Sequence, residues 1–162
     1  DGVKYGFSDN NVDSMWDRIE SSRSKGFGLE VKRRIMLGTY SLSSGYYDEY
    51  YGKAEMTRQL IKNELNSVFD KVDILVTPTS PTTAFKIGEK ISDPMAMYSN
   101  DIMTIPANIA GIPGISIPVK NSNGLPVGAQ LVGPYLKDNN LLNITNEIQK
   151  LTDWHLNAVE FD

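Results

Sequence analysis

Two kinds of charged group stand among apolar neighbours in segments with helical spacing. The run KRRIM carries Arg33 and Arg34 side by side, and the run MAMYSNDIM carries Asp101 between Met97 and Met103. A guanidinium presents a rigid fork of donors that suits a carboxylate. A carboxylate among apolar side chains is either exposed on the far face or paired with a cation. Taken alone, each charge is more often a solvated one. Together they would clamp the carboxylate and the ammonium of an amino acid.

Other catalytic chemistry has little support in this sequence. There is no cysteine, which excludes a thiolate nucleophile and a cysteine metal site, and the one histidine is His155. That histidine follows Trp154 near the end of the chain, where a surface or packing role is favoured over a general base. The run SLSSGYY (41–47) offers hydroxyl groups beside a glycine with no base near it, so it predicts a break between helices.

Composition describes an ordinary globular chain. It has 162 residues, of which 40% are hydrophobic and 22% charged, and its net charge is −4. A negative charge is the wrong sign for a protein whose main work is gripping a phosphate backbone. No apolar run approaches the roughly 20 residues of a membrane span. We therefore expect a soluble protein of the cytoplasm with no membrane contact. The first residue is Asp1 and no secretion signal follows it, which suggests a chain cut from a longer one.

Helical periodicity recurs along the chain. It predicts helices over residues 11–22, over a segment that follows KGFG (25–28), over 47–71 and over 138–151. In the last helix the side chains expected to point inward are Leu141, Leu142, Thr145, Ile148 and Leu151, with Asp138 as the cap. A further helix is expected over 94–104, because Pro94 suits its first position and Asp93 or Ser92 its cap. Pro106 should bend or end that helix.

The remaining segments read as strands and loops. Short β-rich runs predict strands at 3–7, 73–79, 114–119 and 127–133, with Asn-Gly at 123–124 turning a hairpin between the last two. Residues 79–93 have no helical pattern and predict a long ordered loop. Helices mixed with a few strands predict an α/β fold. Three or four strands are few for such a sheet, which again suggests a fragment of a larger domain.

Four longer segments carry a resemblance to a known family: GFGLEVKRRIMLGTYSLSSGYYDEYY, DILVTPTSPTTAFKIGE, DPMAMYSNDIMTIPANIAGIPGISIPV and GLPVGAQLVG. They resemble the C-terminal third of the A subunits of glutamyl-tRNA(Gln)/aspartyl-tRNA(Asn) amidotransferases, a group within the amidase signature family. The patterns N-x-A-G-x-P-x-I-S-x-P and L-P-V-G-x-Q-L-x-G are shared by amidases generally. RRIMLGTYSLSSGYYDEYY and MYSND are closer to the tRNA-dependent group.

The resemblance implies part of the amidase signature fold, a mixed β-sheet flanked by helices, with residues 1–162 as the C-terminal portion of a single domain. The family's nucleophilic serine, its bridging serine and its lysine belong to segments that this sequence does not contain, as does the oxyanion hole. The resemblance therefore implies no catalytic residue in this chain, and we expect the chain alone to be inactive on amides.

Substrate recognition is what the resemblance assigns to this chain. Arg34 matches the family's arginine for the α-carboxylate of glutamine, and Asp101 matches the aspartate for its α-ammonium. Arg33 is the alternative if the register is off by one. We expect both side chains to point to one cavity, bounded by the loop after the 73–77 strand and the turn before Gly111. No metal ligand and no cofactor are expected in the chain.

The implied partners are the B and C subunits of the amidotransferase. In the family, ammonia released from glutamine passes to the B subunit, which uses ATP and Mg²⁺ to amidate mischarged Glu-tRNA(Gln) or Asp-tRNA(Asn). A fragment would also expose strand edges and apolar surface, so self-association is expected. Two alternatives stay open: a piece of another amidase-signature amide hydrolase without a tRNA, and a non-catalytic interaction module that reuses the half-fold.

Overall fold

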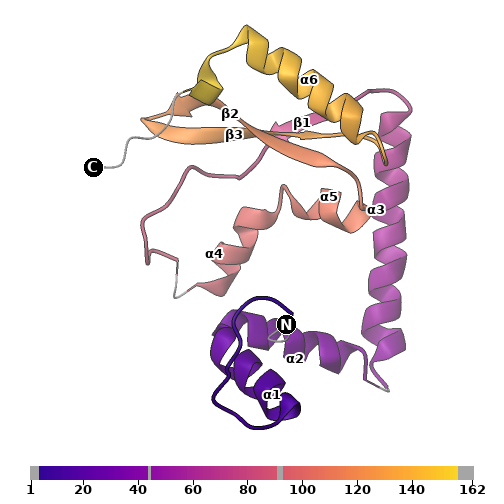
Figure 1. Cartoon of the computed structure of the whole chain (residues 1–162). Coiled ribbons are helices and arrows are strands. Elements are labelled where there is room, and N and C mark those ends of the chain that lie inside the picture. Colours follow the sequence, from indigo (N-terminus) through magenta and orange to yellow (C-terminus); the bar gives the residue numbers. More distant parts are fainter. Residues whose placement is uncertain (1–3, 44, 91–92, 157–162) are drawn as a thin grey trace. The chain divides into compact units, whose positions relative to one another are not determined.

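A computed structural model describes residues 4–43, 45–90 and 93–156 of the chain (Figure 1). The chain divides into two compact units, residues 1–55 and residues 56–162. Within the described ranges, no helix is both long enough and apolar enough to cross a bilayer.

The first unit is helical. It holds α1 (Met15–Gly26), α2 (Leu29–Ser41), the π-helix η1 (Tyr47–Gly52) and the first residues of α3 (Lys53–Phe69). Helix α1 begins later than residue 11 because Ser14 caps it: the Ser14 hydroxyl accepts a 3.0 Å hydrogen bond from the Asp17 amide. The predicted strand at 3–7 is wrong for its described part. Residues 4–6 form a bend instead, where Gly6 takes a φ of 84° that turns the chain.

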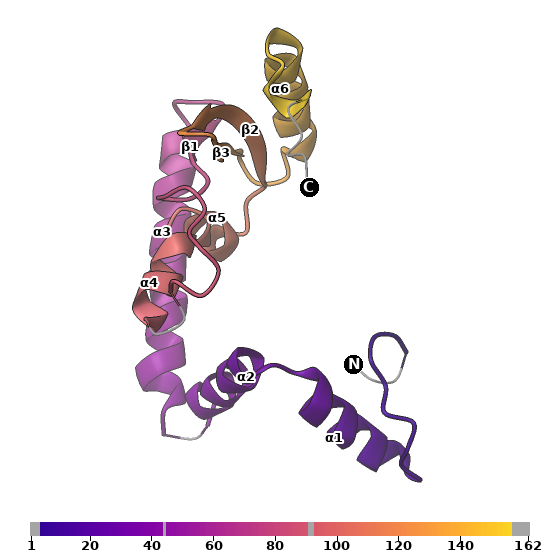
Figure 2. The ribbon, with the colours of Figure 1, turned by 90° about the vertical axis from the view of Figure 1, so that its left-hand side faces the viewer.

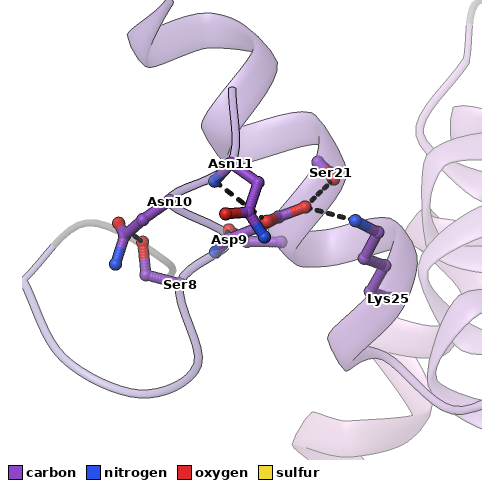
Figure 3. Close-up of polar contacts among 7 residues, drawn as sticks. Ser8, Asp9, Asn10, Asn11, Ser21 and Lys25 are labelled. Carbon is purple, nitrogen blue, oxygen red and sulfur yellow. Dashed lines mark hydrogen bonds and ion pairs between the residues drawn. The ribbon is translucent and has the colours of Figure 1, made fainter. Parts of the chain in front are cut away.

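A buried carboxylate ties the N-terminal segment to α1 (Figure 3). Asp9 is 5% exposed. Its carboxylate accepts hydrogen bonds from the Lys25 ammonium, from the Ser21 hydroxyl at 2.5 Å and from the Asn11 amide at 3.2 Å. Its own amide donates to the Ser22 hydroxyl at 2.8 Å. A charged acceptor with three donors, one of them a cation, is well compensated for its burial.

This network predicts an acid-sensitive fold in the first unit. Lys25, then Ser21 and the Asn11 amide, hold the pKa of Asp9 at about 2, below its usual 3.8. Because the pKa is lowered by folding, the stabilisation is complete above about pH 4 and is lost as the pH falls towards 2. Urea unfolding of the Asp9→Asn variant should depend less on pH in that window than unfolding of the unchanged chain. A pH dependence of equal size in both chains would contradict the assignment.

The predicted break between two helices is confirmed. Helix α2 ends at Ser41, and the hydroxyls of Ser41 and Ser43 donate to the carbonyls of Leu37 and Tyr40. These serines therefore bind backbone, as a helix break requires. The long helix that follows does not start as an α-helix: Tyr47–Gly52 form a π-helical turn, and regular α3 begins after Gly52.

The second unit is built on an antiparallel sheet of three strands. Strands β1 (Leu75–Pro78), β2 (Gly114–Ser122) and β3 (Leu125–Val132) lie in the order β1–β3–β2. The predicted hairpin is confirmed. Asn123 and Gly124 take φ values of 52° and 80°, the left-handed pair that a two-residue hairpin turn requires.

Helices cover both faces of this sheet (Figure 2). On one face, α6 (Asp138–Leu151) packs Leu141 onto Ile117 and Leu131. On the other face, Val132 packs with Ala110 of α5 (Ile105–Ala110) and with Phe69 of α3. Side chains alternate along a strand. Gln130 therefore shares the second face with Val132, and so do Ser116 and Gly128, through the registers Ser116↔Gln130 and Pro118↔Gly128.

Two helix predictions need correction. The helix expected over 94–104 is α4 (Pro94–Tyr98) followed by the 3-10 helix η2 (Ser99–Asp101) and a turn, and α5 then carries Pro106 in its own first turn. A proline in the first turn of a helix loses no intrahelical bond, which explains the new start. In α6, Leu141 and Thr145 are buried as expected, but Leu142 and Leu151 are exposed. The cap is Lys137, and Asp138 is the first helical residue.

Candidate functional site

Asp101 lies at the end of a short, well-terminated helical segment. Asp93 caps α4, since its carboxylate accepts the Ala96 amide at 3.0 Å. The chain continues through η2 and turns at Asp101, whose carbonyl accepts both the amide of Thr104 at 3.0 Å and its hydroxyl at 3.1 Å. The Asp101 residue is exposed. A turn closed in this way fixes the backbone beneath the Asp101 carboxylate.

Two side chains from elsewhere in the second unit hold this segment on either side of Asp101. The Lys90 ammonium donates to the Asn100 Oδ1 at 2.9 Å and lies 4.3 Å from the centroid of the Phe85 ring. The Gln130 Nε2 donates to the Met103 carbonyl at 2.9 Å and to the Thr77 hydroxyl at 3.1 Å. Gln130 is 6% exposed. The segment that carries Asp101 is thus attached both to the loop after β1 and to the sheet.

A cavity of about 610 Å³ opens beside this segment. It is lined by residues 78–85 after β1, by Asn100, by Ser116 and Ser122 of β2 and by residues 126–128 of β3. The loop after β1 lines this cavity, whereas the turn before Gly111 is not among its lining residues. Asn100 lines the cavity, and its neighbour Asp101 does not. The described residues that line it offer hydroxyls and one amide, and none of them has an ionisable side chain.

The floor of the cavity depends on a glycine. The hydroxyls of Thr79 and Ser116 lie 2.6 Å apart over Gly128. A Cβ at Gly128 would come within 2.7 Å of the Thr79 Oγ1 and within 2.9 Å of the Ser116 Oγ. Contacts that short force the neighbouring atoms to move. Gly128 is thus required for the hydroxyl pair to close across strand β3, which lies between β1 and β2.

Replacing Gly128 by alanine should therefore destabilise the chain by about 1–3 kcal/mol, the usual cost of overpacking. Urea unfolding measures this change in the free energy of unfolding. Gly38→Ala is the matched control, because Gly38 lies inside α2 and its Cβ would meet nothing within 4 Å. That change should stabilise its helix by about 0.5–1 kcal/mol. Equal effects of the two changes would contradict this account of Gly128.

Arg34 lies on the surface of α2 in the first unit. Its Nε donates to the Glu30 Oε1 at 3.0 Å, and Arg33 donates from Nη1 to the Glu30 Oε2 at 2.9 Å. The Arg34 side chain is 64% exposed and that of Arg33 49%. One carboxylate therefore holds both guanidiniums on the same side of the helix. No residue of α2 is buried, although Ile35, Met36 and Leu37 follow the arginines directly.

The predicted site residues are thus found on ordered elements, in two different units. Arg34 belongs to residues 1–55 and Asp101 to residues 56–162, so their convergence on one cavity stays a prediction. His155 is exposed on the 3-10 helix Trp154–Leu156, which agrees with a surface role. The sequence does not predict a role for Gln130, Lys90 or Asn100. Only Gln130 has a visible signal, a polar residue inside the apolar run VGAQLVG.

Comparisons with known proteins agree with the resemblance. The A subunit of the glutamyl-tRNA(Gln) amidotransferase of Microcystis aeruginosa is 54% identical over 162 residues, which is 99% of this chain and 33% of that protein. The corresponding protein of Bacillus pumilus is 52% identical over 155 residues, 96% of this chain and 32% of that protein. The chain therefore spans about a third of the length of the curated relatives it matches.

Structural comparison gives the same relationship. The crystal structure of the A subunit of glutamyl-tRNA(Gln) amidotransferase from Thermotoga maritima matches with a TM-score of 0.56 and 52% identity, over 73% of this chain and 26% of that chain. The family model described as Amidase matches residues 1–142. That match covers far more than half of the sequence, and the chain therefore belongs to the Amidase family.

Proposed function

We propose that this chain is the substrate-recognition portion of the glutaminase subunit of a tRNA-dependent amidotransferase. One observation carries the proposal: nearly the whole chain is 52–54% identical to curated A subunits. An amidase of known structure shares only 25% identity. The difference favours the amidotransferase over a simple amide hydrolase, and an ordered fold with a defined Asp101 segment supports a binding role.

In the proposed mechanism, Arg34 and Asp101 hold the two ends of glutamine that do not react. The Arg34 guanidinium binds the α-carboxylate through paired hydrogen bonds, and the Asp101 carboxylate binds the α-ammonium. Fixing both groups directs the side-chain amide to the nucleophile, which the resemblance places outside this chain. Such positioning lowers the barrier because the reacting groups no longer have to find their geometry.

The proposal extends to partners and cofactors. Ammonia released from glutamine would pass to the B subunit, which would use ATP and Mg²⁺ to activate the mischarged glutamate or aspartate on tRNA, with the C subunit completing the complex in the cytoplasm. The chain itself would hold no metal or cofactor. Exposed apolar side chains on α2, among them Ile35 and Met36, support self-association of the isolated chain.

The test is which product is formed by the complex that contains the full-length protein, amidated tRNA or only free ammonia. We expect it to convert Glu-tRNA(Gln) to Gln-tRNA(Gln) with glutamine as the nitrogen donor, measured by the amino acid recovered from the tRNA. Release of ammonia from simple amides with no amidated tRNA would instead identify an amide hydrolase. Neither activity would favour the interaction module.

A further inference from the structure

We propose that Gln130 is a positioning residue for Asp101, and that Lys90 is its counterpart on the other side. This inference rests on the proposed function, because it concerns how the contact to the substrate ammonium is held. Gln130 is the glutamine of the pattern L-P-V-G-x-Q-L-x-G, and the sequence alone does not explain its role.

The buried Gln130 side chain links two segments by hydrogen bonds, and these bonds determine the orientation of its amide group. The Met103 carbonyl can only accept, so the Gln130 amide must turn its Nε2 towards it, at 2.9 Å. The second N–H of the same nitrogen reaches the Thr77 hydroxyl of β1 at 3.1 Å. Met103 lies two residues after Asp101. Strand β3 thus holds the segment downstream of the aspartate through one buried side chain.

Lys90 holds the segment that precedes Asp101, through the side chain of Asn100. An ammonium only donates, so the Asn100 amide turns its Oδ1 to Lys90, at 2.9 Å, and its Nδ2 the other way. The ammonium also lies 4.3 Å from the centroid of the Phe85 ring, which favours this placement. Asn100 directly precedes Asp101. The aspartate therefore stands between two anchors that come from different parts of the unit, and the Asp101 carbonyl closes the turn with Thr104.

This arrangement has a consequence for substrate binding. An exposed carboxylate on a short 3-10 helix has few contacts of its own to hold its direction. The two anchors supply that direction, since loss of Gln130 frees the Met103 carbonyl and loss of Lys90 frees the Asn100 side chain. A displacement of about 1 Å at a substrate-positioning group can change a rate by up to about a hundredfold. Gln130 and Lys90 would act on glutamine through Asp101 without touching it.

The first experiment uses the 162-residue chain and reads amide hydrogen exchange. Gln130→Met keeps the side-chain length and removes both donors. It should speed exchange of the Thr104 amide, which donates to Asp101, by about tenfold or more, and leave the Thr79 amide, which donates to the Gly128 carbonyl, unchanged. Thr77→Val is the matched control. It removes the hydrogen bond between Gln130 and β1, keeps the one to Met103, and should leave the Thr104 amide protected. Equal acceleration at both reporter amides, or none, would overturn the proposal.

The second experiment uses the complex with the full-length protein. Gln130→Met and Lys90→Met should raise the KM for glutamine about tenfold with little change in kcat for ammonium-driven amidation, and Lys90→Arg should restore a KM near that of the unchanged enzyme. Asp101→Asn separates this inference from the proposed function. If Asp101→Asn leaves the glutamine KM unchanged, the proposed site is wrong. If Asp101→Asn raises it and Gln130→Met does not, the positioning role is wrong.

Discussion

Replacing Arg34 by alanine in the full-length protein is expected to lower kcat/KM for glutamine by about 10- to 100-fold. The change removes a charged hydrogen-bond partner of the substrate carboxylate, and such a bond contributes about 1.5–3 kcal/mol. Amidation driven by added ammonium should be spared, because ammonium bypasses glutamine binding. Steady-state rates with each nitrogen donor, read as amidated tRNA, measure the two effects separately.

Arg33→Ala is the matched control for this prediction. Both arginines pair with Glu30 at 2.9–3.0 Å from the exposed surface of α2. Exposed pairs of this kind contribute little to stability, so the two variants should fold equally well. Only Arg34→Ala should lose glutamine use. A larger loss for Arg33→Ala would shift the assignment by one residue, and an equal loss with both nitrogen donors would contradict the clamp.

Local signals in the sequence were enough to predict much of the fold. Asn123 and Gly124 specify the hairpin because few residue pairs adopt two positive φ values. Asp93 before Pro94 specifies the start of α4, since one residue caps and the other suits the first helical position. The three-residue and four-residue spacing along α3 and α6 predicts long helices. These features depend on neighbours in sequence alone.

The errors have a different origin. Residues 4–6 have the composition of a strand, but a strand exists only where another strand pairs with it. They form a bend instead, and the chain after them binds α1 at Asp9, whose amide donates to the Ser22 hydroxyl. Leu142 directly follows the buried Leu141 and so points to another side of α6, and Leu151 is the last residue of that helix; both are exposed. Periodicity predicts which helix face is apolar, and the size of the sheet decides how much of that face is covered.

The candidate site shows the same division. Arg34 and Asp101 were predicted from residue type and resemblance, because a charge in an apolar context is visible in the sequence. The residues that hold the Asp101 segment, Gln130 and Lys90, are not predicted by the sequence. Gln130 lies 27 residues beyond Met103, and Lys90 lies ten residues before Asn100 across α4. Side-chain tethers over such separations depend on strand register and helix ends, which a single sequence does not fix.

The isolated 162-residue chain is expected to release no ammonia from glutamine above a buffer blank. The resemblance assigns the nucleophilic serine, its bridging serine, the lysine and the oxyanion donors to segments outside this sequence. Some hydroxyls of the described residues are engaged elsewhere: Ser41 and Ser43 donate to backbone carbonyls, and Thr79 pairs with Ser116. Among the described residues, no ionisable group lines the cavity that holds this last pair.

Without a base, a serine or threonine hydroxyl is a weak nucleophile at neutral pH. Removing even one oxyanion donor from a complete enzyme lowers kcat by about 100- to 1000-fold, so the loss of all these groups should abolish measurable turnover. Ammonia release over a range of glutamine concentrations tests this, with the full-length protein in its complex as the positive control. Saturable release by the isolated chain would contradict the prediction. Its loss in a Ser116→Ala variant would then identify a nucleophile within this chain.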